Sequence, residues 1–198
     1  PMLSIQDVFT KEEVTAWVED VQKMHPDARF SVEEKIDGLS MTLRYQDGEL
    51  VLAETRGNGL VGEDVTQNAL VIPDIRRKID LPGYVELRGE VYMSHEDFEK
   101  FNAQQEEAGK KTAANPRNLA AGTLRQLDSR VVKKRGLKML VFNVQDAREN
   151  GADLMESHTG GLEILQKNGV ACVPHTLCET PEQVLAAIDA IALLESGL

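Results

Sequence analysis

The 198-residue sequence has few cysteines, few aromatic residues and no long apolar run. Its two cysteines cannot form a disulfide framework, which favours a reducing, cytoplasmic setting. The stretch over residues 184–194 is interrupted by Asp189 and is shorter than the roughly 20 residues that a membrane-spanning helix needs. The first residues carry neither the basic region nor the apolar run of a signal peptide. We therefore expect a folded domain without a membrane segment.

The sequence also lacks the basic excess of a domain that binds nucleic acid by bulk electrostatics, because its net charge is −11. Its basic residues are unevenly distributed. Nine of them lie between Lys110 and Lys138 beside a single acidic residue, a local charge of +8 that leaves −19 for the remainder. This basic segment suits either a solvated helix face or local contact with a polyanion.

Periodicity and turn residues predict an α+β fold with antiparallel sheets flanked by helices. Thr10 and Glu13 form a capping box ahead of apolar residues at helical spacing, which predicts a first helix. Strands are expected over 30–35, 39–46, 49–55, 84–93, 138–144 and 170–177, and further helices over 65–71, 95–107, 116–127, 161–167 and 181–195. A hairpin is expected around Asp47-Gly48. Strands in hairpins and helices in separate blocks argue against a doubly wound parallel fold.

The segment from Glu33 to Gly38 offers the first candidate chemistry. If it is extended, a period of two residues places Glu33, Lys35 and Asp37 on one face. One interpretation is a ladder of surface salt bridges. The other is a nucleophilic lysine, which must lose its proton before it can attack phosphorus or carbon. The spacing alone leaves both interpretations open.

Five blocks of sequence decide between them. They are, in order, PMLS at 1–4, EEKIDG at 33–38, TRGNGLVGEDVT at 55–66, ELRGEV at 86–91 and NPRNLAAGTLRQLD at 115–128. Together they resemble the adenylation domain of bacterial NAD-dependent DNA ligases, over nearly the whole chain and more weakly after about Ala147. The short lysine motif also occurs in ATP-dependent ligases and mRNA capping enzymes, whereas the last block resembles the NAD-dependent group. The resemblance implies a nucleotidyltransferase fold, related to ATP-grasp folds.

The resemblance implies that Lys35 is the catalytic nucleophile. In the family this lysine attacks the α-phosphorus of NAD, expels nicotinamide mononucleotide and holds AMP as a phosphoramidate. AMP then passes to the 5′-phosphate of nicked double-stranded DNA, and the adjoining 3′-hydroxyl displaces it, in DNA replication and repair. Asp37 would act beside the lysine, through the ribose or a metal, and Mg²⁺ is the implied metal.

The resemblance also implies which residues surround the adenosine. Glu33 would meet the adenine, and Ser4 with Ile5 would border the adenine pocket. Arg56 and Glu90 would contact the ribose. The residue types fit these roles, because a carboxylate accepts hydrogen bonds from ribose hydroxyls and a glycine-rich turn lets the backbone approach a ligand closely.

Phosphate and base contacts are implied for three further residues. Arg117 and Arg125 lie eight residues apart on one expected helix and suit a paired guanidinium site for a phosphate of AMP or of the nick; solvated helix charges are the alternative. Phe142 resembles the aromatic residue that stacks on the purine, and a core phenylalanine is equally compatible. The run at 133–135 is interpreted as a solvated turn, with DNA backbone contact in the full ligase as the alternative.

No metal site is predicted from the sequence. Cys172, His175 and Cys178 have a faintly metal-like spacing, but Pro174 interrupts it and no fourth ligand is close. We interpret the two cysteines as buried thiols on a strand.

Domain organisation follows from what the resemblance covers. Residues 1–198 are expected to be the core of the adenylation domain, without the N-terminal nicotinamide-binding module and the later lysine blocks. We expect this piece to be a monomer that adenylates itself feebly or not at all. Two alternatives remain, namely a non-catalytic nucleotide-binding module derived from a ligase and an ATP-dependent nucleotidyltransferase.

Overall fold

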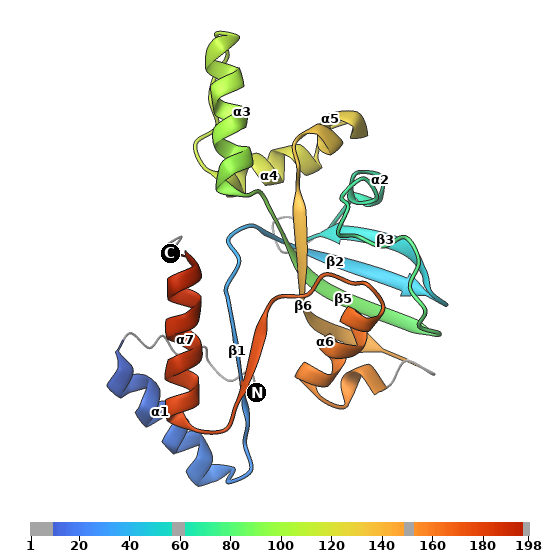
Figure 1. The fold of residues 1–198 in the computed structure, drawn as a ribbon. Helices are drawn as coiled ribbons and strands as arrows, with labels where there is room; N and C mark the ends of the chain where they lie inside the picture. Colours follow the sequence, from blue (N-terminus) through green and yellow to red (C-terminus); the bar gives the residue numbers. More distant parts are fainter. Residues whose placement is uncertain (1–9, 57–61, 149–152, 196–198) are drawn as a thin grey trace. The chain divides into compact units, whose positions relative to one another are not determined.

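A computed structural model describes residues 10–56, 62–148 and 153–195, and the chain divides into two compact units (Figure 1). The terminal unit comprises Pro1–Glu34 and Pro174–Leu198, and the central unit comprises Lys35–Val173. Both contain helices and antiparallel strands, so the predicted α+β class is confirmed. None of the helices that the structure describes is both long and apolar enough to cross a bilayer.

The terminal unit pairs one strand from each end of the chain. Its elements are α1 (Lys11–Met24), β1 (Phe30–Glu33), β7 (His175–Cys178) and α7 (Pro181–Glu195). Strands β1 and β7 run antiparallel, and Val18, Phe30 and Cys178 lie in the core that the helices close. The hydroxyl of Thr10 accepts the amide of Glu13 at 3.1 Å, so the capping box is confirmed.

The central unit is built on a five-stranded antiparallel sheet of order β4-β3-β2-β5-β6. Its strands are β2 (Leu39–Gln46), β3 (Glu49–Thr55), β4 (Glu63–Asp64), β5 (Tyr84–Tyr92) and β6 (Lys138–Ala147). Its helices are α2 (Thr66–Ala69), α3 (His95–Glu107), α4 (Pro116–Leu124), α5 (Ser129–Lys134) and α6 (His158–Lys167). Between β2 and β3, Asp47 and Gly48 have φ of 50° and 84°, the positive values of the expected type I′ turn.

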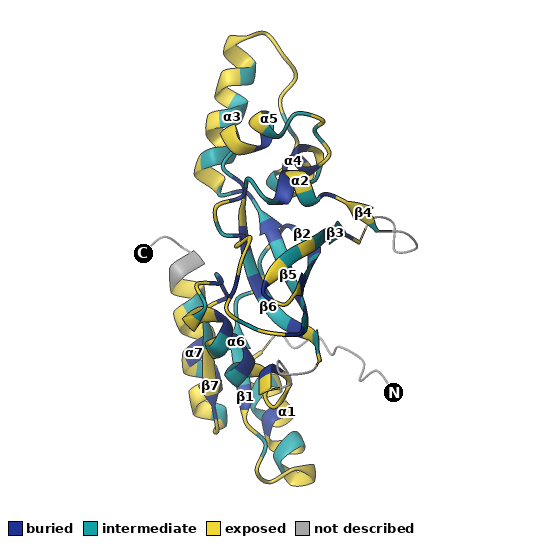
Figure 2. Cartoon of the chain, turned by 90° about the vertical axis from the view of Figure 1, so that its right-hand side faces the viewer, coloured by how far each residue is buried: buried dark blue, intermediate teal, exposed yellow. Residues whose placement is uncertain are grey.

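The two faces of this sheet differ completely. Buried and half-buried residues alternate along β5 (Figure 2), as the period of a strand requires. One face carries the core residues Leu43, Leu87 and Val91, and α2, α4 and α6 contribute to the same core. The opposite face carries pairs of polar residues from β2 and β5, namely Ser40 with Glu90, Thr42 with Arg88 and Arg44 with Glu86.

The expected elements differ from the observed ones mainly at their ends. The helix expected over 116–127 ends at Leu124, and Leu127, expected among its apolar positions, is fully exposed. The run at 133–135, expected to be a turn, begins inside α5, which the side chain of Asp128 caps. The strand expected over 170–177 begins only at His175.

Candidate functional site

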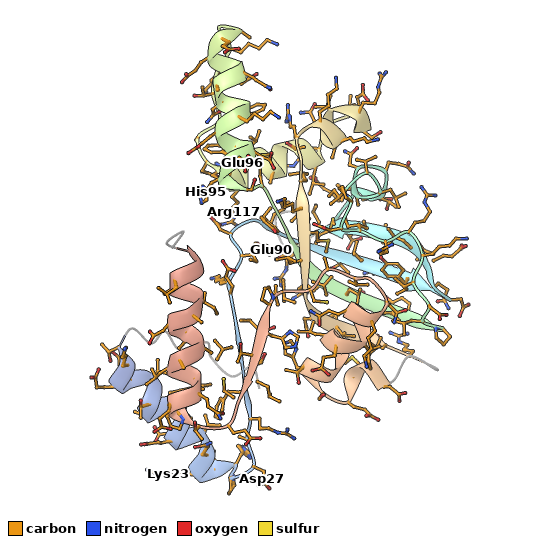
Figure 3. The ribbon with its side chains drawn as sticks, in the orientation of Figure 1. Lys23, Asp27, Glu90, His95, Glu96 and Arg117 are labelled. Atoms are coloured by element: carbon orange, nitrogen blue, oxygen red, sulfur yellow. The ribbon has the colours of Figure 1, made fainter. Side chains whose placement is uncertain are left out.

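Glu90 is the centre of a hydrogen-bonded group on the polar face of the sheet. The Ser40 hydroxyl, opposite on β2, donates to its carboxylate at 3.2 Å, and the Gly38 amide also donates to it. Burial of this half-buried side chain raises the pKa of Glu90, and the charge of Asp37 raises it further. The two hydrogen bonds and the charge of Arg117 act in the opposite direction. Figure 3 shows Glu90 on β5 and Arg117 at the start of α4 near one another.

Gly38 ties the lysine motif to β5. A Cβ atom at this position would collide with the carbonyl oxygen of Val91, so only glycine allows the segment to approach the strand this closely. The anchor places Asp37 near enough to Glu90 to act on its charge. Lys35, two residues earlier, is exposed and does not line either of the cavities described below.

Three arginines gather around a cavity of about 370 Å³ beside this group. Arg56 follows β3, whereas Arg117 and Arg125 come from the two ends of α4. Ser40, the partner of Glu90, lines the same cavity, which therefore adjoins the carboxylate. Arg125 forms an exposed ion pair with Glu63 at 3.6 Å. The remaining positive charge makes the cavity suitable for an anion such as a phosphate.

The start of α4 is built to present Arg117 to the cavity. The side chain of Asn115 caps the helix by accepting the amide of Asn118 at 2.8 Å, and Pro116 occupies the first turn. Arg117 and Asn118 follow at once and both line the cavity. The positive end of the helix dipole adds to the charge of the guanidinium there.

A second cavity, of about 270 Å³, extends along the polar face of the sheet. Arg56 and Ser40 line both cavities, so the two adjoin. Arg44 donates to Glu86 at 2.9 Å in this cavity, whereas Arg88 makes no ion pair with any residue in the described ranges. The polar face therefore continues as a band of charged groups beyond Glu90.

The structure brings together only part of the predicted site. Arg56, Arg117 and Arg125 share one cavity and Glu90 adjoins it, whereas their contacts with a nucleotide stay predictions. Phe142 is half-buried at an irregularity of β6 and lines neither cavity. The predictions for Ser4 and Ile5 lie outside the described residues. Glu33 belongs to the terminal unit, where it takes part in β1.

Several residues of the site were not predicted from the sequence. Ser40 and the Gly38 amide hold Glu90 only because β2 and its preceding segment pair with β5, and no local pattern shows that pairing. Arg88 lies on the polar face of β5 and was given no role from the sequence. The alternation of charged residues along β5 was the signal that could have found it.

The expectation of two buried thiols on a strand is confirmed for burial, but only Cys178 lies on a strand, whereas Cys172 precedes β7 and forms an isolated bridge with Val141. Both thiols are buried, and burial raises the pKa of Cys172 to about 12. No group of three or more metal-ligating side chains occurs in the ranges that the structure describes.

The antiparallel sheets, the carboxylate on β5 and the arginine-lined cavity are consistent with an α+β domain of the nucleotidyltransferase class. Sequence comparison then names the family. The chain belongs to the NAD-dependent DNA ligase adenylation domain family, whose sequence model matches residues 1–195. The resemblance seen in the five sequence blocks is thereby confirmed.

Curated relatives of this chain are named DNA ligase. A DNA ligase of Clostridium kluyveri is 45% identical over 190 residues, which is 95% of this chain and 28% of the relative. A DNA ligase of Dinoroseobacter shibae is 45% identical over 96% of the chain and 26% of the relative, and one of Lactobacillus helveticus is 52% identical over 72% and 21%. The chain therefore spans about a quarter of the length of these relatives.

Proposed function

We propose that this adenylation domain takes AMP from NAD onto Lys35 and passes it to the 5′-phosphate of nicked duplex DNA. The observation that carries the proposal is the cavity shared by Arg56, Arg117 and Arg125, which adjoins Glu90. Family membership supports NAD as the nucleotide. The anchor at Gly38 joins the lysine motif to the strand of Glu90.

In the adenylation step Lys35 supplies the electron pair. Its ammonium group must first lose a proton, since only the neutral amine is a nucleophile. The amine nitrogen then bonds to the α-phosphorus, the bond from that phosphorus to the bridging oxygen breaks, and nicotinamide mononucleotide leaves with the electron pair. The nitrogen releases a second proton to solvent, which gives the neutral nitrogen of the phosphoramidate. Negative charge on the phosphoryl oxygens is stabilised by guanidinium groups fixed in advance, a role that suits Arg117 and Arg125.

Glu90 and Arg56 are proposed to orient the nucleotide. An ionised Glu90 accepts hydrogen bonds from ribose hydroxyls, and its bond from Ser40 fixes the carboxylate for that purpose. Arg56 lies at the junction of the two cavities, where its side chain can reach ribose and phosphate oxygens. Orientation of this kind lowers the barrier because the α-phosphorus is held in position for attack.

Mg²⁺ fits this site only if the protein and the substrate phosphates share its coordination. Mg²⁺ is commonly held by one or two carboxylates together with substrate phosphates, rather than by a cage of protein groups. Asp37 is exposed and lies near Glu90, so it offers the one carboxylate that such a site needs. The ion would supply positive charge at the transferred phosphoryl group.

The test is made on the complete product of the gene that contains this chain. NAD labelled in its adenylate phosphate is added with Mg²⁺, and covalent labelling of the protein is measured without DNA. We expect Lys35→Ala to abolish labelling and the exposed control Lys167→Ala to keep it. Undiminished labelling of Lys35→Ala would refute the proposal. Labelling from ATP instead of NAD would favour the ATP-dependent alternative.

A further inference from the structure

Arg125, which lines the proposed phosphate cavity, is flanked by two backbone carbonyl groups that one distant side chain binds. The side-chain amide of Asn68, in α2, donates to the carbonyl oxygen of Leu124 at 2.8 Å and to that of Gln126 at 2.7 Å. A side-chain amide has two N–H groups, which is enough for both bonds. Figure 2 shows α2 beside α4, as these bonds require. The backbone of Arg125 is therefore held on both sides.

The end of α4 needs such a partner. The last carbonyl groups of a helix have no partner within it, and α4 ends at Leu124. Asn68 is a buried residue, and its bond to Leu124 is buried as well, so water cannot readily replace it. Loss of the Asn68 donors would leave this carbonyl group without a partner and would release the backbone that carries Arg125.

Helix α2, which carries Asn68, is itself tied to strand β3. The hydroxyl of Thr66, the first residue of α2, accepts the amide of Ala53 at 2.9 Å. Arg56 directly follows the last residue of β3. The same strand thus leads to one arginine of the cavity and fixes the helix that holds another. This connection sets the spacing between the backbones of Arg56 and Arg125.

The side chain of Arg125 has only a weak restraint of its own. Its guanidinium lies 3.6 Å from the carboxylate of Glu63, and both side chains are more than half exposed. Exposed ion pairs contribute little and are screened by salt. The buried bonds of Asn68, rather than this ion pair, therefore determine where the side chain of Arg125 leaves the backbone.

We infer that Asn68 is a positioning residue for Arg125 in the adenylation step. A guanidinium stabilises charge on a transferred phosphoryl group best when it is fixed in place before the reaction, and supporting hydrogen bonds supply that fixation. Asn68 lines neither of the two cavities described above, so it acts through the backbone of Arg125. The inference rests on the proposed function, because it names a residue that the role of Arg125 requires. The alternative is that Asn68 only stabilises the fold.

The substitution Asn68→Asp in the complete gene product tests the inference. Aspartate has nearly the same shape, but it replaces the amide donors by a carboxylate oxygen, which repels the two carbonyl groups. The rate of covalent labelling at saturating NAD should fall about 10-fold, because a small misplacement of a group that contacts the reacting atoms slows a reaction strongly. Asn168→Asp is the matched control, since Asn168 also donates to a backbone carbonyl, that of Ile164 at 3.0 Å, and lines neither cavity. It should leave the rate per folded molecule unchanged.

Combined variants distinguish positioning from a merely structural role. In the Arg125→Ala background, Asn68→Asp should cause no further loss, because the guanidinium through which Asn68 acts is absent. In the Arg117→Ala background it should still lower the rate about 10-fold. Rates are referred to folded protein, whose fraction is measured by circular dichroism. If Asn68→Asp does not fold, Asn68→Ser, which keeps one hydroxyl donor, should show a smaller loss with the same dependence on Arg125.

The inference fails if the Asn68 variant keeps the labelling rate of the wild type. It also fails if the variant lowers the rate by the same factor in the Arg125→Ala and Arg117→Ala backgrounds, because Asn68 would then act independently of Arg125. The proposed function is tested separately by Lys35→Ala, whose undiminished labelling would refute it. Loss of labelling in Lys35→Ala, combined with equal losses in the two arginine backgrounds, would overturn the role of Asn68 and leave the proposed function standing.

Discussion

The two faces of the central sheet use the same strands for opposite purposes. On β5, Leu87 lies on the face that is fully buried, whereas its neighbours Arg88 and Glu90 lie on the polar face that adjoins both cavities. Burial of apolar area stabilises the fold, and half-burial of charge costs stability while preparing a binding surface. The difference teaches that stability and proposed function can be altered separately within one strand.

The largest effect is expected on the buried face. Leu87→Ala removes a fully buried side chain from the core and should lower the free energy of unfolding by about 2–5 kcal/mol. Urea titration measures this loss, and labelling with NAD should be unchanged per folded molecule. A loss below about 1 kcal/mol would show that the two faces do not differ as the core packing implies.

Substitutions on the polar face should affect nucleotide transfer and leave stability almost unchanged. Arg117→Ala and Arg125→Ala each remove an exposed guanidinium from the cavity and should lower adenylation about 10- to 100-fold, the equivalent of one lost charge-assisted hydrogen bond. Stability should stay within about 0.5 kcal/mol. Arg77→Ala, another exposed arginine of the central unit, is the control and should keep full activity. Equal adenylation activity of all three variants would argue against a role of this cavity in adenylation.

A smaller loss is expected where the polar face is held by ion pairs. Arg44 pairs with Glu86 at 2.9 Å and with Glu54 at 4.0 Å, and all three side chains are partly exposed to solvent. Arg44→Ala should therefore lower the free energy of unfolding by no more than about 1 kcal/mol, and added salt should reduce the difference. A loss as large as that of Leu87→Ala would remove the distinction between the faces.

The smallest effect concerns the pH dependence of stability. Because the pKa of Glu90 is raised above its ordinary value of 4.5, the folded protein binds this proton more tightly than the unfolded chain. Stability from this group is therefore greatest below pH 4.5 and falls as the pH rises through the raised pKa. Glu90→Gln should abolish this fall, as measured by urea titrations at several pH values. An identical pH profile in the variant would contradict the burial of Glu90.

Elements with local signals were predicted well from the sequence. The capping box at Thr10 and the turn at Asp47-Gly48 each depend on residues within a few positions, and the structure has both as expected. The predicted end of α4 was wrong, because the residue that binds the observed end is distant in the sequence. Asn68 binds the carbonyl groups of Leu124 and Gln126 from more than 50 residues away, and no helical periodicity indicates such a contact.

The candidate site shows the same division. The strand over 84–93 was predicted because its alternation of residues is local, and Glu90 lies on the polar face of the observed strand β5. The environment of Glu90 could not be predicted, since the hydroxyl of Ser40 reaches it only through the register between β2 and β5. The roles of Lys35 and Asp37 stay predictions.

Arg56 lines both cavities of the polar face, and this sharing has a consequence for occupancy. A single guanidinium cannot give its full attraction to two anions, so an anion in one cavity should bind less tightly when the other is filled. By thermodynamic linkage such an antagonism would be mutual, so an anion in either cavity would lower the affinity of the other cavity for a second anion by the same factor.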